Sequence, residues 1–359
     1  MKLNCTATTL NNQKPNIRDA TVSDLENFVK TANQPSFRKS QIDQWLWQKN
    51  IDSFAQMTNL PSELRTQLQQ HFELRNIQIH QYQISADKTI KFAFKLPDRH
   101  LIESVLIPTE NRVTVCISSQ VGCSLDCRFC ATAKMKRIRN LYWWEIYQQV
   151  QFLQSKSFHY FQTPVTNVVF MGMGEPLMNF NNVISSLGLM TSTDGLNMSP
   201  GRFTVSTSGI PKLICRLADE NTGVNLAVSL HSANQDIRKE IMPFSEKFPL
   251  VQLLDSLVYW YRKTNVKITF EYLVLKNVND TMEDIYQLVD FCKKVPCKVN
   301  FIEYNPIEGD RFQEADWNIV EQYQKILLKH NIHSTIRRSR GGDIDAACGQ
   351  LANKMGVTL

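Results

Sequence analysis

Residues 113–131 read VTVCISSQVGCSLDCRFCA and place Cys123, Cys127 and Cys130 directly behind a short β-rich run. β-branched residues favour a strand, so the cysteines occupy the loop that follows it. Their spacing, C-x3-C-x2-C, puts three thiols on one short loop. Three thiolates can each bind a different iron of a [4Fe–4S] cluster and leave the fourth iron without a protein ligand, unlike the four-cysteine ferredoxins. The stretch therefore predicts an iron–sulfur cluster with one open iron.

Two other interpretations of the three cysteines stay open at this point. Structural zinc needs four closed ligands, usually in paired sets. No second pair lies nearby, and no histidine occurs between His100 and His159. Plain packing cysteines are the other alternative. The chain has nine cysteines, an odd number that does not suggest a disulfide framework.

The rhythm of the chain beyond residue 111 predicts an α/β fold. Short β-rich runs alternate with helical patterns such as Leu141–Gln154 and Leu250–Arg262, which indicates a parallel sheet. The runs are Val113–Ser118, Val168–Met173, Phe203–Ser206, Asn225–Leu230, Ile268–Leu275, Val299–Tyr304 and Ser334–Arg337. We expect a partial (β/α)6 TIM-like barrel, with its active site at the carboxyl ends of the strands.

Four segments are expected along the chain. Residues 1–75 read as a small helical domain, with Ile42, Trp45 and Leu46 at helical spacing. Residues 76–110 read as a β-rich linker, residues 111–340 as the barrel, and residues 341–359 as a C-terminal segment that carries Cys348.

The composition limits which binding partners and which cellular compartment we expect for the protein. The 359 residues carry a net charge of +6, which permits a phosphate-rich partner and is equally compatible with an ordinary cationic surface. No run of 18 apolar residues occurs, so no membrane span is expected. The first residues lack the apolar core of a secretory signal, so we expect a cytoplasmic protein.

Polar groups follow several of the expected strands. Gly174 and Glu175 lie in the stretch MGMGEP, at residues 171–176. The other candidate residues at expected strand ends are Ser206, Ser229, Leu230, His231 and Asn305. Because strand ends meet at one mouth, these residues are candidates for ligand binding, although tight turns and helix N-caps also explain some of them. Cys116 and Cys348 on their own read more readily as packing cysteines.

These motifs together resemble a known family. The cysteine loop behind a barrel strand is similar to that of the radical S-adenosylmethionine (SAM) superfamily. The segments CISSQVGCSLDCRFCATAK, MGMGEPL, STSG, SLH, YNP and DIDAACGQL occur in this order. They resemble the RlmN-type 23S rRNA adenine-C2 methyltransferases over residues 100–351. The helical module, with FRKSQIDQWLW, resembles that family's N-terminal RNA-binding domain.

The resemblance implies a mechanism and roles for residues. Cys123, Cys127 and Cys130 would hold one [4Fe–4S] cluster, and the polar groups at the strand ends would bind SAM. Cys348 would accept a methyl group from a first SAM. A radical from a second SAM would activate the S-methyl group, which then adds to C2 of adenine. Cys116 would resolve the adduct through a disulfide with Cys348, and Glu103 would be the proton acceptor.

The resemblance also implies partners. These are 23S rRNA at the peptidyl transferase centre, the anticodon loop of some tRNAs, an external electron donor and a thiol reductant for a monomeric enzyme. Basic residues would form a phosphate-binding rim at the mouth: Lys134, Lys136, Arg137, Arg139, Arg337, Arg338 and Arg340. The alternatives are a related adenine-C8 methyltransferase and a non-catalytic RNA-binding protein with a metal-stabilised loop.

Overall fold

The computed structural model describes residues 14–353, which form two compact units with their boundary in the sequence between Asn76 and Ile77. The first unit contains the helices α1 (Val22–Thr31), α2 (Phe37–Trp47) and α3 (Ser62–His71). Leu64 and Leu68 of α3 are buried. On α2 the third buried residue is Trp47 rather than Trp45, because the Trp45 indole N–H turns outward to the Asn59 side chain.

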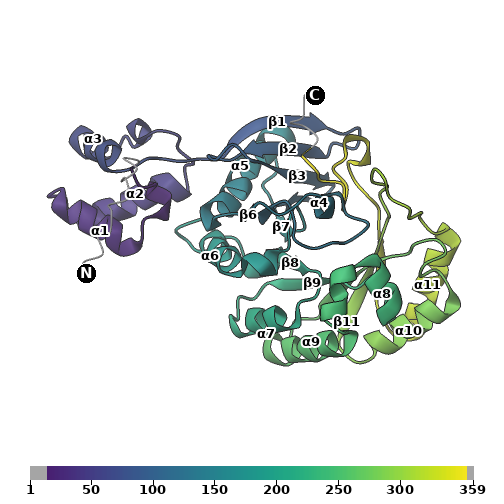
Figure 1. Ribbon diagram of the computed structural model, residues 1–359. Helices are drawn as coiled ribbons and strands as arrows, with labels where there is room; N and C mark the ends of the chain where they lie inside the picture. The colour runs from purple at the N-terminus through teal and green to yellow at the C-terminus, as the bar shows by residue number, and fades with distance from the viewer. Residues whose placement is uncertain (1–13, 354–359) are drawn as a thin grey trace, which may run out of the picture. The chain divides into compact units, whose positions relative to one another are not determined.

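The second unit is built on one ten-stranded sheet (Figure 1). Its order is β1-β2-β3-β4-β7-β8-β9-β10-β11-β12. The strands are β1 (Gln78–Ile84), β2 (Ile90–Lys95), β3 (Leu101–Thr109), β4 (Arg112–Cys116), β7 (Asn167–Phe170), β8 (Phe203–Thr207), β9 (Asn225–Ser229), β10 (Ile268–Leu273), β11 (Cys297–Ile302) and β12 (Ser334–Arg337). From β4 to β12 the neighbours are parallel, which confirms the predicted α/β barrel architecture.

Helices connect the parallel strands and lie on the outside of the sheet (Figure 1). They are α5 (Trp143–Phe161), α6 (Phe180–Thr191), α7 (Pro211–Asp219), α8 (Gln235–Ile241), α9 (Leu250–Thr264), α10 (Met282–Cys292) and α11 (Trp317–Lys329). The sheet ends at β1 and β12, so the barrel is open, as expected for a partial (β/α)6 fold. The sequence patterns missed the short helices α7 and α8, of nine and seven residues.

The segment expected as a β-rich linker extends the barrel sheet. Strands β1, β2 and β3 form an antiparallel meander, and β3 pairs with β4 through Val105 and Cys116. This meander therefore belongs to the same compact unit as the barrel.

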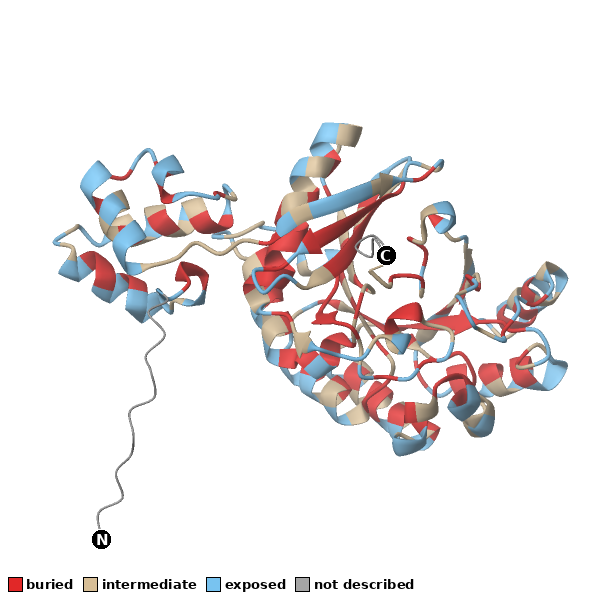
Figure 2. Cartoon of the chain, turned by 45° about the horizontal axis from the view of Figure 1, so that its top comes forward, coloured by how far each residue is buried: buried red, intermediate tan, exposed pale blue. Residues whose placement is uncertain are grey.

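The parallel strands have one apolar face and one polar face. The strands of the sheet are largely buried (Figure 2). Val115, Val168, Val205, Phe270 and Phe301 are buried and belong to the face that packs against the helices. Because strand side chains alternate, their neighbours in the sequence face the barrel interior. None of the helices that the structure describes is long and apolar enough to cross a membrane.

Candidate active site

A small hairpin fixes the base of the cysteine loop. Strand β5 (Gln120–Val121) pairs with β6 (Arg139–Asn140), and the three cysteines lie between them in the sequence. The Gln120 side chain donates to Asn140 Oδ1 at 2.8 Å and accepts from the Glu175 N–H at 2.9 Å. Gly174 adopts φ +95°, and a Cβ there would lie 2.4 Å from the Gln120 side chain. Glycine is therefore required where the loop meets the MGMGEP turn.

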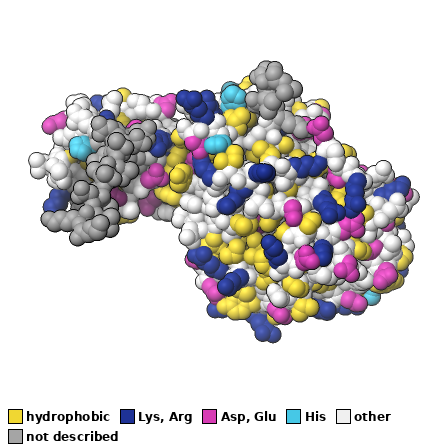
Figure 3. Space-filling model, in the orientation of Figure 1, with side chains coloured by type: hydrophobic (Ala, Val, Ile, Leu, Met, Phe, Trp, Pro, Cys, Tyr) yellow, Lys and Arg dark blue, Asp and Glu magenta, His cyan; other side chains and the backbone are white. Residues whose placement is uncertain are grey.

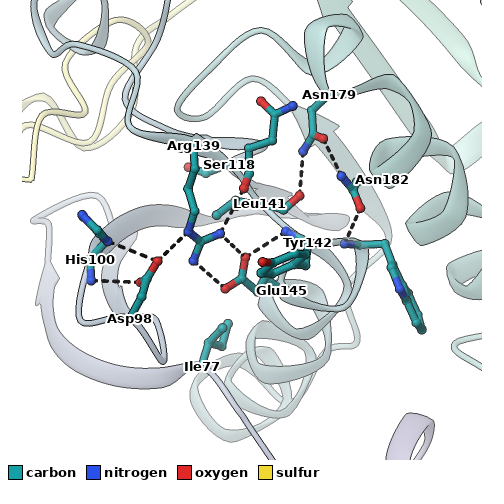
Figure 4. Close-up of polar contacts among 12 residues, drawn as sticks. Ile77, Asp98, His100, Ser118, Arg139, Leu141, Tyr142, Glu145, Asn179 and Asn182 are labelled. Atoms are coloured by element: carbon teal, nitrogen blue, oxygen red, sulfur yellow. Dashed lines mark hydrogen bonds and ion pairs between the residues drawn. The ribbon is translucent and has the colours of Figure 1, made fainter. Parts of the chain in front are cut away.

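An ion-pair network holds the far end of this hairpin (Figure 4). The Arg139 guanidinium forms two bonds to the Glu145 carboxylate, at 2.7 and 2.8 Å, and a third to Asp98 at 2.5 Å. Such fork-shaped pairing is geometrically specific. Arg139 is thus engaged in fixing the loop to α5, although the sequence analysis expects it on a phosphate-binding rim.

The three loop thiols share one cavity of about 140 Å³. Burial raises the pKa of Cys123 to about 12 and raises the pKa of Cys127 and Cys130 as well. Each thiolate charge also opposes the others, so ionised thiols here require a bound positive charge. Among residues 14–353, no group of three or more His, Cys, Asp or Glu side chains is placed so that it could hold a single metal ion. A donor set of three soft thiols fits an iron–sulfur cluster.

The same cavity contains most of the residues expected to bind SAM. Gly174, Glu175, Ser206, Ser229 and His231 all line it. Glu175 is buried, and its carboxylate accepts the N–H groups of Ser208 at 2.8 Å and Leu177 at 3.1 Å. Burial raises the pKa of Glu175, while the bond from Ser208 opposes the rise. The structure thus joins the ends of β7, β8 and β9 around one buried carboxylate.

His231 presents a hydrogen-bond donor to this cavity. Its Nδ1 accepts the Leu273 N–H at 3.1 Å, so the remaining proton of the neutral ring lies on Nε2. That Nε2 is buried without a partner in the part of the chain that the structure describes. Desolvation lowers the pKa of His231 to about 3, so the ring is neutral at physiological pH. The polar atom it leaves unpaired suits a bound ligand.

The other two expected SAM residues lie beside the cavity. Leu230 is fully buried, and its N–H donates to the Glu271 carbonyl. The Asn305 side chain donates to the Cys348 carbonyl at 3.2 Å. Asn305 therefore positions the C-terminal segment in this structure.

The C-terminal segment brings Cys348 to the cysteine loop. Ala131 N–H donates to the Gly349 carbonyl at 2.7 Å, and the Thr132 hydroxyl donates to the Leu351 carbonyl at 2.6 Å. Cys348 lies on the wall of the 140 Å³ cavity and on that of a second cavity of about 690 Å³. These two hydrogen bonds tie the segment around Cys348 to the cysteine loop.

Cys116 and Arg337 complete this part of the site. Cys116 is buried on β4 and lines the second cavity with Cys348. Burial is the larger cause, and the Cys348 charge the smaller, of a rise in the pKa of Cys116 to about 12. The Cys348 thiolate charge likewise raises the pKa of Cys130 and Arg337. Cys348 therefore lies between the loop cysteines and Cys116, with a guanidinium beside both thiols.

Glu103 lies on the walls of neither cavity. Its carboxylate is fully buried, 3.6 Å from the Lys91 ammonium, and Oε2 accepts the N–H groups of Ala352 and Asn353 at 2.9 and 3.1 Å. In this conformation Glu103 holds the C-terminal segment that follows Cys348.

Sequence reasoning missed two charged residues of the site, Glu271 and Arg238, and expected a third, Arg337, only on the phosphate rim. Glu271 and Arg337 line both cavities, and Arg338 lines the second. Arg238 of α8 is buried and donates to the Ser208 and Leu230 carbonyls. A nearby Cys127 thiolate charge partly offsets the burial that lowers the pKa of Arg238 to about 10. No sequence motif marks Arg238.

The fold and the three-cysteine loop define a radical SAM enzyme. Residues 117–291 match the Radical SAM superfamily, and residues 15–74 match the Ribosomal RNA large subunit methyltransferase N-terminal domain. A radical SAM methyltransferase from Sphaerobacter thermophilus has a similar structure, with a TM-score of 0.88 at 35% identity over 94% of this chain and 99% of that one.

Curated relatives give the family. The chain is 54% identical to a probable dual-specificity RNA methyltransferase RlmN from Christiangramia forsetii, over 95% of this chain and 97% of the relative. It is 39% identical to the dual-specificity RNA methyltransferase RlmN of Nautilia profundicola, over 92% and 96%. The chain belongs to the RlmN family of radical SAM RNA methyltransferases. Enzymes of this class use a [4Fe–4S] cluster and SAM.

Proposed function

We propose that the chain methylates C2 of an adenosine in 23S rRNA, at the peptidyl transferase centre, and also an adenosine in the anticodon loop of some tRNAs. The observation that carries the proposal is that Cys348 lines one cavity together with the loop cysteines and a second cavity together with Cys116. An ordinary polar methyl transfer needs a nucleophilic acceptor, and C2 of adenine is electron-poor. A thiol that carries the methyl group beside a radical source meets that difficulty.

The cluster and SAM, when bound, supply the methyl group and a radical that abstracts hydrogen. Cys123, Cys127 and Cys130 hold the cluster, and Gly174, Glu175, Ser206, Ser229, Leu230, His231 and Asn305 hold SAM. Cys348 Sγ carries the methyl carbon between the cavity of the radical source and the cavity on its other side. It is the exposed cysteine of the site, so it can receive the carbon and present it to RNA.

Cys116 frees the product. Once the methylene carbon joins Cys348 Sγ to C2, the Cys116 thiolate attacks Cys348 Sγ. An S–S bond forms, the S–C bond breaks, and the carbon leaves with the electron pair and takes a proton to become a methyl group. The burial that raises the pKa of Cys116 keeps it protonated until this step, and the Arg337 guanidinium favours its ionised form. An external thiol then reduces the disulfide.

Glu103 is proposed as the acceptor of the C2 proton. In the structure its Oε2 is occupied by the Ala352 and Asn353 N–H groups, so the C-terminal segment has to shift before the carboxylate can take a proton. Glu103→Gln keeps an oxygen for these N–H groups and cannot accept a proton. We expect the covalent adduct to accumulate in this variant, and normal turnover would assign Glu103 to holding the segment alone.

The partners follow from the same proposal. RNA and an electron donor meet the protein in the cytoplasm, where the chain acts as a monomer, and the helical unit before Ile77 binds RNA. Lys136 and Arg137, on the loop after the cysteines, are exposed, as an RNA contact requires. On the face drawn in Figure 3, basic and acidic side chains are interspersed, so the basic residues visible there do not form one continuous patch.

Two cysteine variants test the proposal. Cys348→Ala should yield no methylated RNA, and Cys116→Ala should trap a covalent protein–RNA adduct that survives denaturing electrophoresis. Cys292→Ala, at a buried cysteine on α10, is the matched control and should retain methylation. Mass spectrometry of nucleosides identifies the product. 8-Methyladenosine in place of 2-methyladenosine would assign the chain to the C8 chemistry, and RNA binding without any methylation would leave only a binding role.

A further inference from the structure

The interior of the barrel holds a chamber whose wall is partly polar and partly apolar. Barrels of this kind normally fill their interior with branched apolar side chains. Here the second cavity, of about 690 Å³, is lined by hydroxyl and amide side chains from six strands. They are Thr114, Asn167, Thr204, Thr269, Asn300 and Thr335. Polar groups are unfavourable in a core unless they are bonded, and the volume is typical of ligand sites. The chamber is therefore suited to a polar ligand.

Cys348 connects this chamber to the radical source. The two cavities share a wall that includes Cys348, Glu271 and Arg337, while the loop thiols Cys123 and Cys127 line the first cavity only. A carbon carried on Cys348 Sγ thus has its source on one side and the chamber on the other. If the proposed function holds, on which this inference rests, the chamber is where the target adenine sits.

A network of side chains fixes one carboxylate oxygen of Glu271 and leaves the other unpaired. The Thr335 hydroxyl donates to Asn300 Oδ1 at 2.6 Å, which turns the Asn300 amide group toward Glu271. Asn300 Nδ2 then donates to Glu271 Oε1 at 3.1 Å. Glu271 is only 5% exposed, and within residues 14–353 its Oε2 has no hydrogen-bond partner. A buried polar atom left unpaired on a cavity wall indicates a missing ligand group.

We propose that Glu271 recognises the target base. Its Oε2 accepts a hydrogen bond from the 6-amino group of the target adenine, and this bond orients C2 toward Cys348. An ionised carboxylate only accepts hydrogen bonds, and the 6-amino group is a donor that guanine replaces with an oxygen. The 6-amino group and C2 flank N1 on one edge of the ring. Glu271 and the Cys348 thiol lie on the same cavity wall, so the carboxylate can contact the 6-amino group while the thiol faces C2 of the same base.

Exposed cations line the chamber at both ends of the strands. Arg112 opens β4, Lys298 lies near the start of β11, and His333 precedes β12. All three are exposed and line the chamber, at the end of the strands opposite the cysteine loop. Cations at this end suit the phosphates that flank an extruded nucleotide. Arg338 and Arg340, which belong to the phosphate rim expected from the sequence, are also exposed and line the chamber at the carboxyl ends of the strands.

The test compares two RNA substrates in the cluster-loaded enzyme. One is a 23S rRNA hairpin with adenosine at the target position, and the other carries purine riboside, which lacks the 6-amino group. For the wild type we expect kcat/KM to be roughly 10- to 100-fold lower with purine riboside, because a hydrogen bond to a buried charge is lost. Glu271→Leu should bring this ratio close to one, chiefly by slowing the adenosine substrate.

Glu303→Leu is the matched control. Glu303 lines the same chamber, but its carboxylate is already paired with Arg338 at 2.8 Å, so this variant should keep the wild-type ratio. If Glu271→Leu does not fold, as judged by circular dichroism, Glu271→Gln decides, because its neutral oxygen should lower the ratio several-fold.

Three results would overturn the inference. An unchanged ratio in the Glu271 variant, or an equal loss in Glu303→Leu, would overturn the role of Glu271 alone. Absence of 2-methyladenosine from the wild-type reaction would overturn the proposed function and this inference together.

Discussion

The two faces of the parallel strands differ in almost every residue. Toward the helices the strands present residues such as Phe203, Leu226 and Phe270, each fully buried in close packing. Toward the interior, the residues next to them are Thr204, Asn225 and Thr269. The outer face supplies the free energy of folding, since burial of apolar surface is its main favourable contribution. The inner face is free to carry chemistry because the outer face holds the sheet together.

Two substitutions at neighbouring residues of β10 should show the largest difference in stability between the two faces of the sheet. Phe270 is fully buried and packs edge-on against Phe291, with 5.6 Å between ring centroids. Phe270→Ala should lower the free energy of unfolding by about 3–5 kcal/mol, through lost transfer energy and a cavity. Thr269→Val, one residue away but facing the chamber, should change it by less than about 1 kcal/mol. Urea denaturation of both variants measures the difference, and comparable losses would contradict the division of roles.

Alternation explains how much of the site the sequence reveals. The cysteine loop, the MGMGEP turn and the strand-end serines are local motifs, and each lies in the predicted cavity. Glu271 and Arg337 belong to the same inner face, but a single charged residue in a strand does not say whether it lies in a site or at a rim. Their meeting with Cys348 depends on β10, β12 and the C-terminal segment coming together, which no local pattern encodes.

The same limit applies to Glu103. The sequence shows a carboxylate in an apolar strand, which fits a base as well as a rim position. Its carboxylate pairs with Lys91 on the neighbouring strand, and its bonds to Ala352 and Asn353 join positions about 250 residues apart in sequence. Only the fold shows that part of the inner surface is covered by the protein's own C-terminal segment rather than left open for a ligand.

The covered part of the inner surface gives the next prediction. Lys91 and Glu103 are both buried, and Lys91→Met would leave a buried carboxylate without its cation. Removal of one partner from a buried pair typically costs about 3–5 kcal/mol. Two N–H donors still bond to Glu103 Oε2, so we expect Lys91→Met to lower the free energy of unfolding by about 2–3 kcal/mol. Hydrogen exchange at the Ala352 and Asn353 amides should accelerate in parallel.

Lys95→Met provides the control for this change. Lys95 ends the same strand, β2, and is exposed, so its loss should alter neither stability nor exchange at these amides. If Lys91→Met also left both unchanged, the buried pair would not be what holds the C-terminal segment against β3.

The smallest expected effect concerns His231, where the cluster-side cavity requires a neutral ring. Its pKa falls from 6.5 in the unfolded chain to about 3 in the fold, chiefly through desolvation. Below pH 6.5 the unfolded state binds a proton that the folded state does not, so the stability that the neutral ring allows is lost as the pH falls. Between pH 7 and pH 5 the wild type should lose about 2 kcal/mol more than His231→Gln. His80→Gln, at an exposed histidine, should follow the wild type in urea denaturation at both pH values. Parallel behaviour of all three proteins would show that His231 is not held neutral, and that the donor assigned to its Nε2 is wrong.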